Sequence, residues 1–380
     1  MFTTGRRILG GLAAGVLAAA LATAPARAAD ASWQRVAAPP AVPQAGLNAV
    51  AARTGDDIWA VGHEAGAAGT PAQGRPLILH FDGRTWRRTP VAGATWTGDL
   101  RSVAASGARQ AWATGTDTGG AFHLLRWDGA RWAEAPYPGE DAGVTAYKVF
   151  AGPGGETWLL TGGTPGYGLL RRAGGTWQSV PNPPSASGVS GLRIYGPDRV
   201  WAAGSTSAGQ FGDSYAARWD GTRWHELPAY DGGFYEAFVD VAAPSDDDVW
   251  AVGNGRGIGT VAPVVPVLAH WDGTAWTKTP ISWIPSPSGI NVGSVTSLAV
   301  DDSGNPAWIG IGDTYGTPPD AATYARFENG TWVEHYGPAD GWTSNPRMYV
   351  THAPGTSAYW SVGSARDAAG DLEPRIERTG

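Results

Sequence analysis

Two interleaved series of tryptophans constrain the fold of this 380-residue chain more than any other feature. The first series, often followed by glycine as in W-A-V-G, consists of Trp59, Trp112, Trp158, Trp201, Trp250, Trp308 and Trp360. The second, most often after a tight turn such as W-D-G-x-x-W, consists of Trp33, Trp86, Trp132, Trp177, Trp224, Trp276 and Trp332. Seven copies of each tryptophan indicate seven structural repeats.

Each repeat is predicted to contain four short strands, which we name A to D. Around Trp59 these strands are predicted at 47–52, 57–62, 77–81 and 85–89. Asp-Gly or Asn-Gly between strands C and D is typical of a two-residue hairpin turn with positive φ angles. A repeat length of about 50 residues is typical of a four-stranded propeller blade.

The two series are offset by one strand at the ends of the chain. Trp33 precedes the first strand-B tryptophan, whereas the repeat of Trp360 ends at Gly380 without a strand D. Segment 32–36 resembles a strand D and 376–380 the strand C before it, so pairing them closes a ring without exposed sheet edges. We therefore predict an all-β fold, a seven-bladed β-propeller of four-stranded blades over residues 29–380, with the last blade closed by the N-terminal strand.

The first 28 residues have the pattern of a signal peptide. Arg6 and Arg7 precede the apolar run 8–21, and Ala26-Arg27-Ala28 is a cleavage signal. The pattern predicts a secreted, extracellular product, with Sec and twin-arginine export both open. No second apolar run has the length of a membrane span, so we expect no membrane insertion.

Composition excludes several classes of function. The net charge of −7 becomes more negative once the cationic leader is removed, which argues against nucleic acid and anionic lipid as partners. The absence of cysteine excludes disulfides, thiolate nucleophiles and cysteine-ligated metals.

Most recurring residues are interpreted as structural. The fourteen tryptophans are expected to pack between adjacent blades. A position in strand C, basic in six blades, is expected to stack on neighbouring indoles in a repeated interblade contact: His80, Arg126, Arg171, Arg218, His270, Arg326 and Glu377. The acidic A–B turns are interpreted as solvated caps rather than metal sites. Lys148, Arg193 and Asp240, in the middle of A strands, are interpreted first as an interblade pair and, alternatively, as residues that border the central opening.

Binding residues are expected on the D–A and B–C loops, which share one face and run long at 63–75, 91–99, 137–145, 254–266 and 281–291. Aromatic rings there can stack on sugar rings while carboxylates accept hydrogen bonds from hydroxyls, although the same residues would suit a protein partner or could fold back to pin the loops. The predicted ligand-binding residues are Trp96, Asp99, Tyr137, Asp141, Tyr230, Asp231, Tyr235, Trp283, Asp340 and Trp342.

No catalytic motif accompanies these loops. The seven histidines form no H-E-x-x-H motif, and G-x-S-x-G is absent. Asp99, Asp141, Asp231, Glu236, Asp240 or Asp340 could pair around one opening as in a glycosidase or lyase, so whether the chain is an enzyme stays open. We expect no metal and no cofactor.

The pattern D-[IV]-W-A-V-G with L-x-[HR]-[WF]-D-G-x-x-W resembles the tryptophan-rich propeller repeats of secreted bacterial proteins, over residues 32–380. The resemblance implies a lectin-like or adhesive protein. The first hypothesis is thus a secreted module that binds carbohydrate or a cell-surface ligand. The alternatives are a polysaccharide-acting glycosidase or lyase, and an interaction scaffold for another secreted protein.

Overall fold

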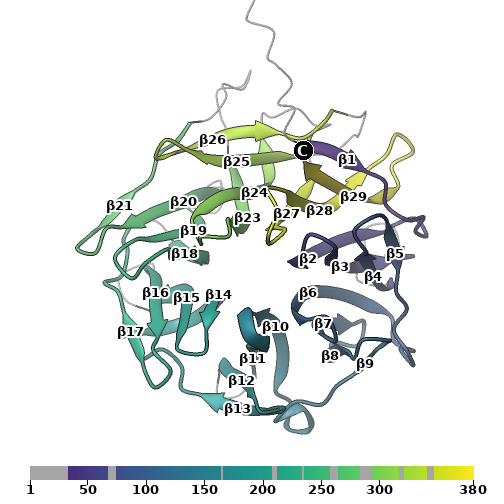
Figure 1. The fold of residues 1–380 in the computed structure, drawn as a ribbon, viewed down its shortest axis with the longest axis horizontal. Helices are drawn as coiled ribbons and strands as arrows, with labels where there is room; N and C mark the ends of the chain where they lie inside the picture. The colour runs from purple at the N-terminus through teal and green to yellow at the C-terminus, as the bar shows by residue number, and fades with distance from the viewer. Residues whose placement is uncertain are drawn as a thin grey trace, which may run out of the picture.

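The computed structural model describes residues 33–66, 74–163, 166–207, 212–232, 235–256, 264–282, 292–315, 321–339 and 346–380. The predicted signal peptide lies outside these residues. Seven antiparallel four-stranded sheets are arranged in a ring around a central axis, one sheet with a short fifth strand at its edge (Figure 1). The predicted seven-bladed β-propeller is confirmed.

Each blade comprises four consecutive strands, except at the closure. Blade 1 contains β2 (Gly46–Thr54), β3 (Asp57–Glu64), β4 (Arg75–Phe81) and β5 (Trp86–Arg88); blade 2 contains β6 (Gly98–Gly107), β7 (Gln110–Asp117), β8 (Phe122–Trp127) and β9 (Trp132–Glu134); and blade 3 contains β10 (Thr145–Ala151), β11 (Thr157–Gly162), β12 (Gly168–Ala173) and β13 (Thr176–Val180). Blade 4 contains β14 (Ala186–Gly196), β15 (Arg199–Thr206), β16 (Ser214–Trp219) and β17 (Trp224–Glu226), and blade 5 contains β18 (Tyr235–Ala242), β19 (Val249–Arg256), β20 (Val264–Trp271) and β21 (Trp276–Lys278).

Blade 6 contains β23 (Val292–Val300), β24 (Pro306–Tyr315), β25 (Thr323–Glu328) and β26 (Thr331–Tyr336), with the short β22 (Ile281–Ser282) parallel to β26 at its outer edge. Blade 7 contains β27 (Arg347–His352), β28 (Tyr359–Arg366), β29 (Leu372–Thr379) and β1 (Trp33–Val36). The 3-10 helices η2 (Glu140–Ala142) and η3 (Pro153–Gly155) lie on either side of β10 in the sequence.

The ring is closed by pairing of the two ends of the described chain. Strand β1 runs antiparallel to β29, with Trp33 opposite Thr379 and Val36 opposite Ile376. The side chain of Trp33 then reaches blade 6, where its ring stacks on Tyr324 at 4.3 Å and meets the edge of Trp308 at 5.1 Å. The offset between the two tryptophan series therefore corresponds to a shared seventh blade.

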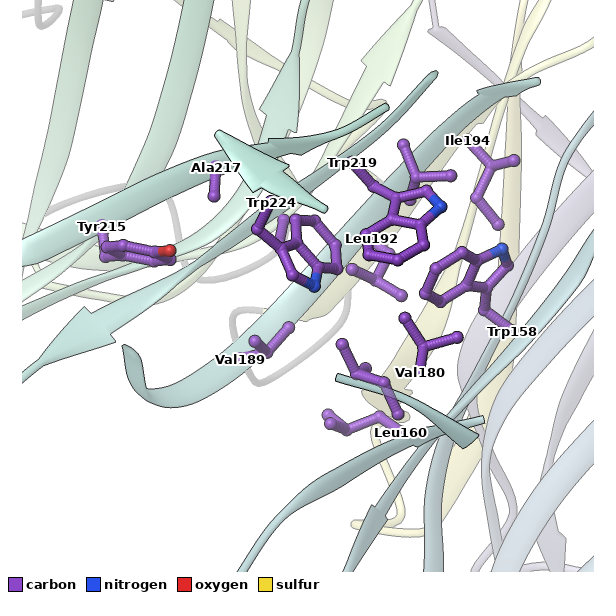
Figure 2. Packing of buried hydrophobic residues seen from close by; sticks show 13 residues of the cluster. Trp158, Leu160, Val180, Val189, Leu192, Ile194, Tyr215, Ala217, Trp219 and Trp224 are labelled. Atoms are coloured by element: carbon purple, nitrogen blue, oxygen red, sulfur yellow. The ribbon is translucent and has the colours of Figure 1, made fainter. Parts of the chain in front are cut away.

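The hydrophobic core is divided into seven clusters, one at each contact between adjacent blades. Within a cluster, the strand-D tryptophan of one blade packs on the strand-B tryptophan of the preceding blade. Trp132 meets Trp59 edge-on at 5.1 Å, and Trp224 meets Trp158 at 6.2 Å, as the cluster between blades 3 and 4 illustrates (Figure 2). The predicted interblade role of the tryptophans is confirmed.

The basic position of strand C stacks within its own blade, not between blades as predicted. His80 lies directly opposite Trp59 in the neighbouring strand, with ring centroids 4.0 Å apart, and Arg126 lies over Trp112 at 5.5 Å. Strand pairing places Arg378 opposite Trp360, so Arg378 occupies this position in blade 7 and the assignment of Glu377 was wrong by one residue. The position is therefore basic in all seven blades.

The C–D turns of blades 3 and 6 contain the predicted two residues, Gly174-Gly175 and Asn329-Gly330, all with positive φ. The C–D turns of blades 1, 2, 4 and 5 contain four residues instead. In blade 1 the paired residues Phe81 and Trp86 flank the turn, so Asp82 to Thr85 form the connection. Asp82 keeps a negative φ, and its carboxylate accepts hydrogen bonds from the backbone N–H groups of Arg84 and Thr85. Only Gly83 supplies a positive φ, of 87°. The aspartate therefore acts as a side-chain acceptor, which stabilises a longer turn.

Candidate functional site

A cavity of about 1250 Å³ lies on the axis of the ring and is lined by the innermost strand of every blade. These strands are β2, β6, β10, β14, β18, β23 and β27, which face the centre in Figure 1. All seven strands begin on the side of the D–A and B–C loops. The mouth of the cavity on that side therefore joins the face on which the sequence predicted binding.

β-Bulges shape this mouth in a way that the sequence pattern does not reveal. The pairing of strands A and B skips one residue near the start of strand A in blades 1 to 6, namely Asn48, Arg101, Tyr147, Ser190, Val239 and Thr296. A bulge redirects the side chain of the extra residue. All of these residues except Ser190 line the cavity, so the bulges place a set of varied side chains around its mouth.

Tyr147 and Arg101 are the most exposed of the bulged side chains. Tyr147 is 50% exposed, and its ring lies nearly perpendicular to that of Phe122, with the two ring centroids 5.0 Å apart. The Arg101 side chain is 59% exposed, and its nitrogen Nε lies 3.7 Å from an oxygen of Asp99. An aromatic face and a guanidinium group are thus both accessible to a ligand at the mouth.

Asp99, a predicted binding residue, lies at this mouth but is already hydrogen-bonded. Its oxygen Oδ1 accepts a hydrogen bond from the side-chain amide of Asn48 at 2.5 Å and lies 3.3 Å from Nδ1 of His63. These contacts join blade 1 to blade 2. Asp99 therefore positions neighbouring polar groups, and the cavity lining in the described residues includes only part of the predicted set.

Arg193 and Asp240 form the predicted interblade pair, and they also line the cavity. Both oxygens of Asp240 lie 3.0 Å from Nη2 of Arg193, which also donates to the backbone oxygen of Leu298 at 2.8 Å. A further bond from Nε to Val241 uses another donor of the guanidinium. Both interpretations of these two residues are therefore confirmed, because the interblade pair itself borders the central opening.

The predicted residues at the outer loops of blades 2 and 3 fold back onto the protein. Trp96 stacks on His123 at 4.1 Å and donates its indole N–H to Glu134 at 2.8 Å. Tyr137 is 7% exposed and donates its hydroxyl to the backbone of Val144, which fixes the loop that carries η2. Asp141 is exposed within η2. The burial of Tyr137 leaves no ring face for a ligand in this conformation.

Between blades 4 and 5, a second group of predicted residues surrounds a buried carboxyl group. Tyr230 packs on Phe238 at 5.7 Å, and Asp231 is exposed beside it. Glu236 is 6% exposed and accepts a hydrogen bond from the N–H of Gly232 at 2.6 Å. Burial, together with the charges of Asp231 and Asp213, raises the pKa of Glu236 to about 7. Such a carboxyl group is protonated in slightly acidic solution.

The four remaining predicted residues lie partly or wholly outside the described part of the chain. Tyr235 begins β18, but its side chain lies outside the described part, as do Trp283, Asp340 and Trp342 entirely. A smaller cleft of about 430 Å³ on the blade 4 side of the loop face contains Tyr215 and Glu226, whose side chains hydrogen-bond at 2.6 Å. The described residues among the predicted set therefore lie at three separate places rather than at one site.

The cavity mouth includes residues that sequence reasoning missed. Tyr147, Arg101 and Arg347 line it, yet each lies within a strand rather than in a long loop. The only signal in the sequence was the size of these three side chains, because most A strands carry small residues. Within the described ranges, no group of three histidine, aspartate or glutamate side chains is arranged to hold a metal ion.

Comparison with known proteins yields structural likeness without sequence relatives. No family model matches the sequence, and no curated protein matches it. The β-propeller domain of the trilobed protease from Pyrococcus furiosus, described as having an open velcro topology, is 9% identical, with 87% of this chain and 93% of that chain covered and a TM-score of 0.50. In this chain, by contrast, β1 pairs with β29.

Two other solved structures extend over similar lengths. A protein of unknown function from Dyadobacter fermentans is 13% identical, covering 92% of this chain and 99% of that chain, with a TM-score of 0.48. The six-bladed fucose-recognising lectin of Aleuria aurantia is 12% identical, covering 89% and 93%, with a TM-score of 0.41. At such identities the likeness concerns the propeller fold alone.

None of the helices in the described residues has the length and apolar character to cross a bilayer.

Proposed function

We propose that this protein is a secreted carbohydrate-binding module whose site is the mouth of the axial cavity on the D–A and B–C loop side. The observation that carries this proposal is Tyr147. It is one of two large hydrophobic side chains exposed in the described part of the chain, and it lines the same cavity as the hydrogen-bonding groups of Arg101 and Asp99. An exposed aromatic face next to polar groups is the combination that sugars require.

The alternative of a polysaccharide-acting enzyme has weaker support. Two carboxyl groups would have to face one open space. Asp240 is paired with Arg193, and Asp99 with Asn48 and His63. The pKa of Glu236 suits a general acid, but its side chain is buried and accepts a hydrogen bond from the N–H of Gly232. We therefore favour binding without catalysis.

Secretion is also part of the proposal, and the signal-peptide pattern of residues 1–28 supports it. Analysis of culture medium for a mature chain that begins near Ala29 tests it. A protein scaffold would instead be indicated by recovery of a stoichiometric secreted partner together with an inactive glycan array.

A glycan array with the purified mature protein tests the proposed function. Tyr147→Ala should abolish binding, whereas Trp96→Ala should leave it intact, because Trp96 is engaged with His123 and Glu134. Both variants should keep the wild-type circular dichroism spectrum. An array without any signal, or signals lost in Trp96→Ala and kept in Tyr147→Ala, would contradict the proposal.

A further inference from the structure

The chain contains only two lysines, and they lie in opposite environments. Lys278 is exposed on β21 at the outer edge of blade 5. Lys148, on β10, lines the axial cavity. All other side-chain cations apart from histidine are arginines. Lysine carries a compact charge with three rotatable donors. It therefore binds a single anionic group as a point charge, whereas arginine binds through the rigid, planar set of donors of its guanidinium.

The Lys148 ammonium group has few partners within the described residues. It donates one hydrogen bond, to the backbone oxygen of Ser190 at 3.1 Å, and lies 5.3 Å from the centre of the Phe150 ring. The carboxylate of Asp240 is occupied by Arg193. Two of its three N–H donors therefore have no protein acceptor among the described residues, and an acceptor from the cavity could satisfy them.

Charge at this end of the cavity is positive although the protein as a whole is negative. If the Arg193–Asp240 pair is taken as neutral, Arg101 and Arg347, near the starts of β6 and β27, line the loop side of the cavity against the carboxylate of Asp99, and Lys148 lines its middle. Asp301 and Asp302 lie at the opposite end, after β23. Burial lowers the pKa of Lys148, and the positive charge of Arg193 acts in the same direction. A bound anion would stabilise the charged form of Lys148.

We propose that Lys148 binds the carboxylate of an acidic sugar within the axial cavity, with Arg101 as a second cation at the mouth. This inference rests on the proposed function and names its substrate class. A carboxylated sugar matches both features of the site, because its ring suits Tyr147 and its charge suits Lys148. The negative outer surface would disfavour such a ligand elsewhere, and the positive mouth would attract it.

Competitive amine labelling tests the inference with an internal control. Wild-type protein is acetylated with a limiting amine reagent, and labelling of Lys148 relative to Lys278 is measured by peptide mass spectrometry. Trigalacturonate at ten times its dissociation constant should lower this ratio about tenfold, since occupied sites cannot react. The neutral trisaccharide cellotriose should change it less than about twofold, and inorganic phosphate tests a simple anion.

Affinities of two variants complete the test. Lys148→Met should weaken trigalacturonate binding by about tenfold or more without changing cellotriose binding, and Lys148→Arg should restore part of the affinity. Binding of both trisaccharides with equal affinity, unaffected by Lys148→Met, would overturn the inference but leave the proposed function intact. Protection by phosphate alone would show an adventitious ion only and would overturn the inference, and failure of every glycan would overturn both proposals.

Discussion

Replacement of Glu236 by glutamine should make the folded protein more stable at neutral and alkaline pH. Glu236 is buried beneath Gly232, and its oxygen Oε2 has no hydrogen-bond partner among the described residues. Ionisation at this position places a charge in a poorly solvated space close to Asp231 and Asp213. Glutamine preserves the shape and the acceptor for Gly232 while removing the charge.

The magnitude follows from the pKa of Glu236. Because the folded state raises this pKa from 4.5 to about 7, the folded protein holds the proton more tightly than the unfolded chain. The resulting stabilisation is fully present below pH 4.5 and is lost as the pH rises to about 7. The difference corresponds to about 3 kcal/mol, so Glu236→Gln should raise the free energy of unfolding by up to that amount at pH 8 and by close to zero at pH 4.

Urea unfolding followed by tryptophan fluorescence at several pH values measures this difference. Comparison of wild type and variant at each pH cancels the titration of all other groups. Glu140→Gln, which changes an exposed carboxylate in η2, serves as the matched control and should show no such pH dependence. A Glu236→Gln variant whose stability relative to wild type is constant from pH 4 to pH 8, or lower at pH 8, would refute the reasoning.

The interblade tryptophans give two further predictions. Trp132→Ala should lower the free energy of unfolding by about 3–5 kcal/mol, because Trp132 is fully buried against Trp59, whereas the partly exposed Trp96→Ala should cost about 1 kcal/mol; equal losses in urea titrations would contradict this account. Trp33→Ala should loosen the closure of the ring, since Trp33 stacks on Tyr324, and hydrogen exchange of β29 amides should accelerate more than that of β4 amides; unchanged exchange in β29 would contradict it.

The fold was predictable because its stabilising contacts recur in the sequence. Strand-D tryptophans such as Trp86, Trp132 and Trp177 pack on a strand-B tryptophan of the preceding blade, so the spacing of the two series indicates the size of each blade. The position of Trp33 before the first strand-B tryptophan likewise indicated that blade 7 contains strands from both ends of the chain. By contrast, the register of Arg378 could not be assigned reliably, because Glu377 and Arg378 are adjacent charged residues at the chain terminus and only strand pairing distinguishes them.

The candidate site was less predictable because exposure depends on tertiary packing. Tyr137 and Tyr147 are ten positions apart, and composition does not distinguish them. The first donates a hydrogen bond to Val144 and is buried, whereas the second lies on a β-bulge and is half-exposed. A bulge moves a side chain relative to the regular alternation of a strand, so the expected orientation fails where Arg101 and Tyr147 reach the cavity mouth.

Hydrogen–deuterium exchange with a saturating glycan tests the location of the binding site most directly. We expect slower exchange in the first residues of β2, β6, β10 and β27, the strands whose beginnings surround the cavity mouth. Exchange in η2 and in residues 227–232 should remain unchanged. Protection confined to those outer segments, with β6 and β10 unaffected, would contradict a site at the axial cavity.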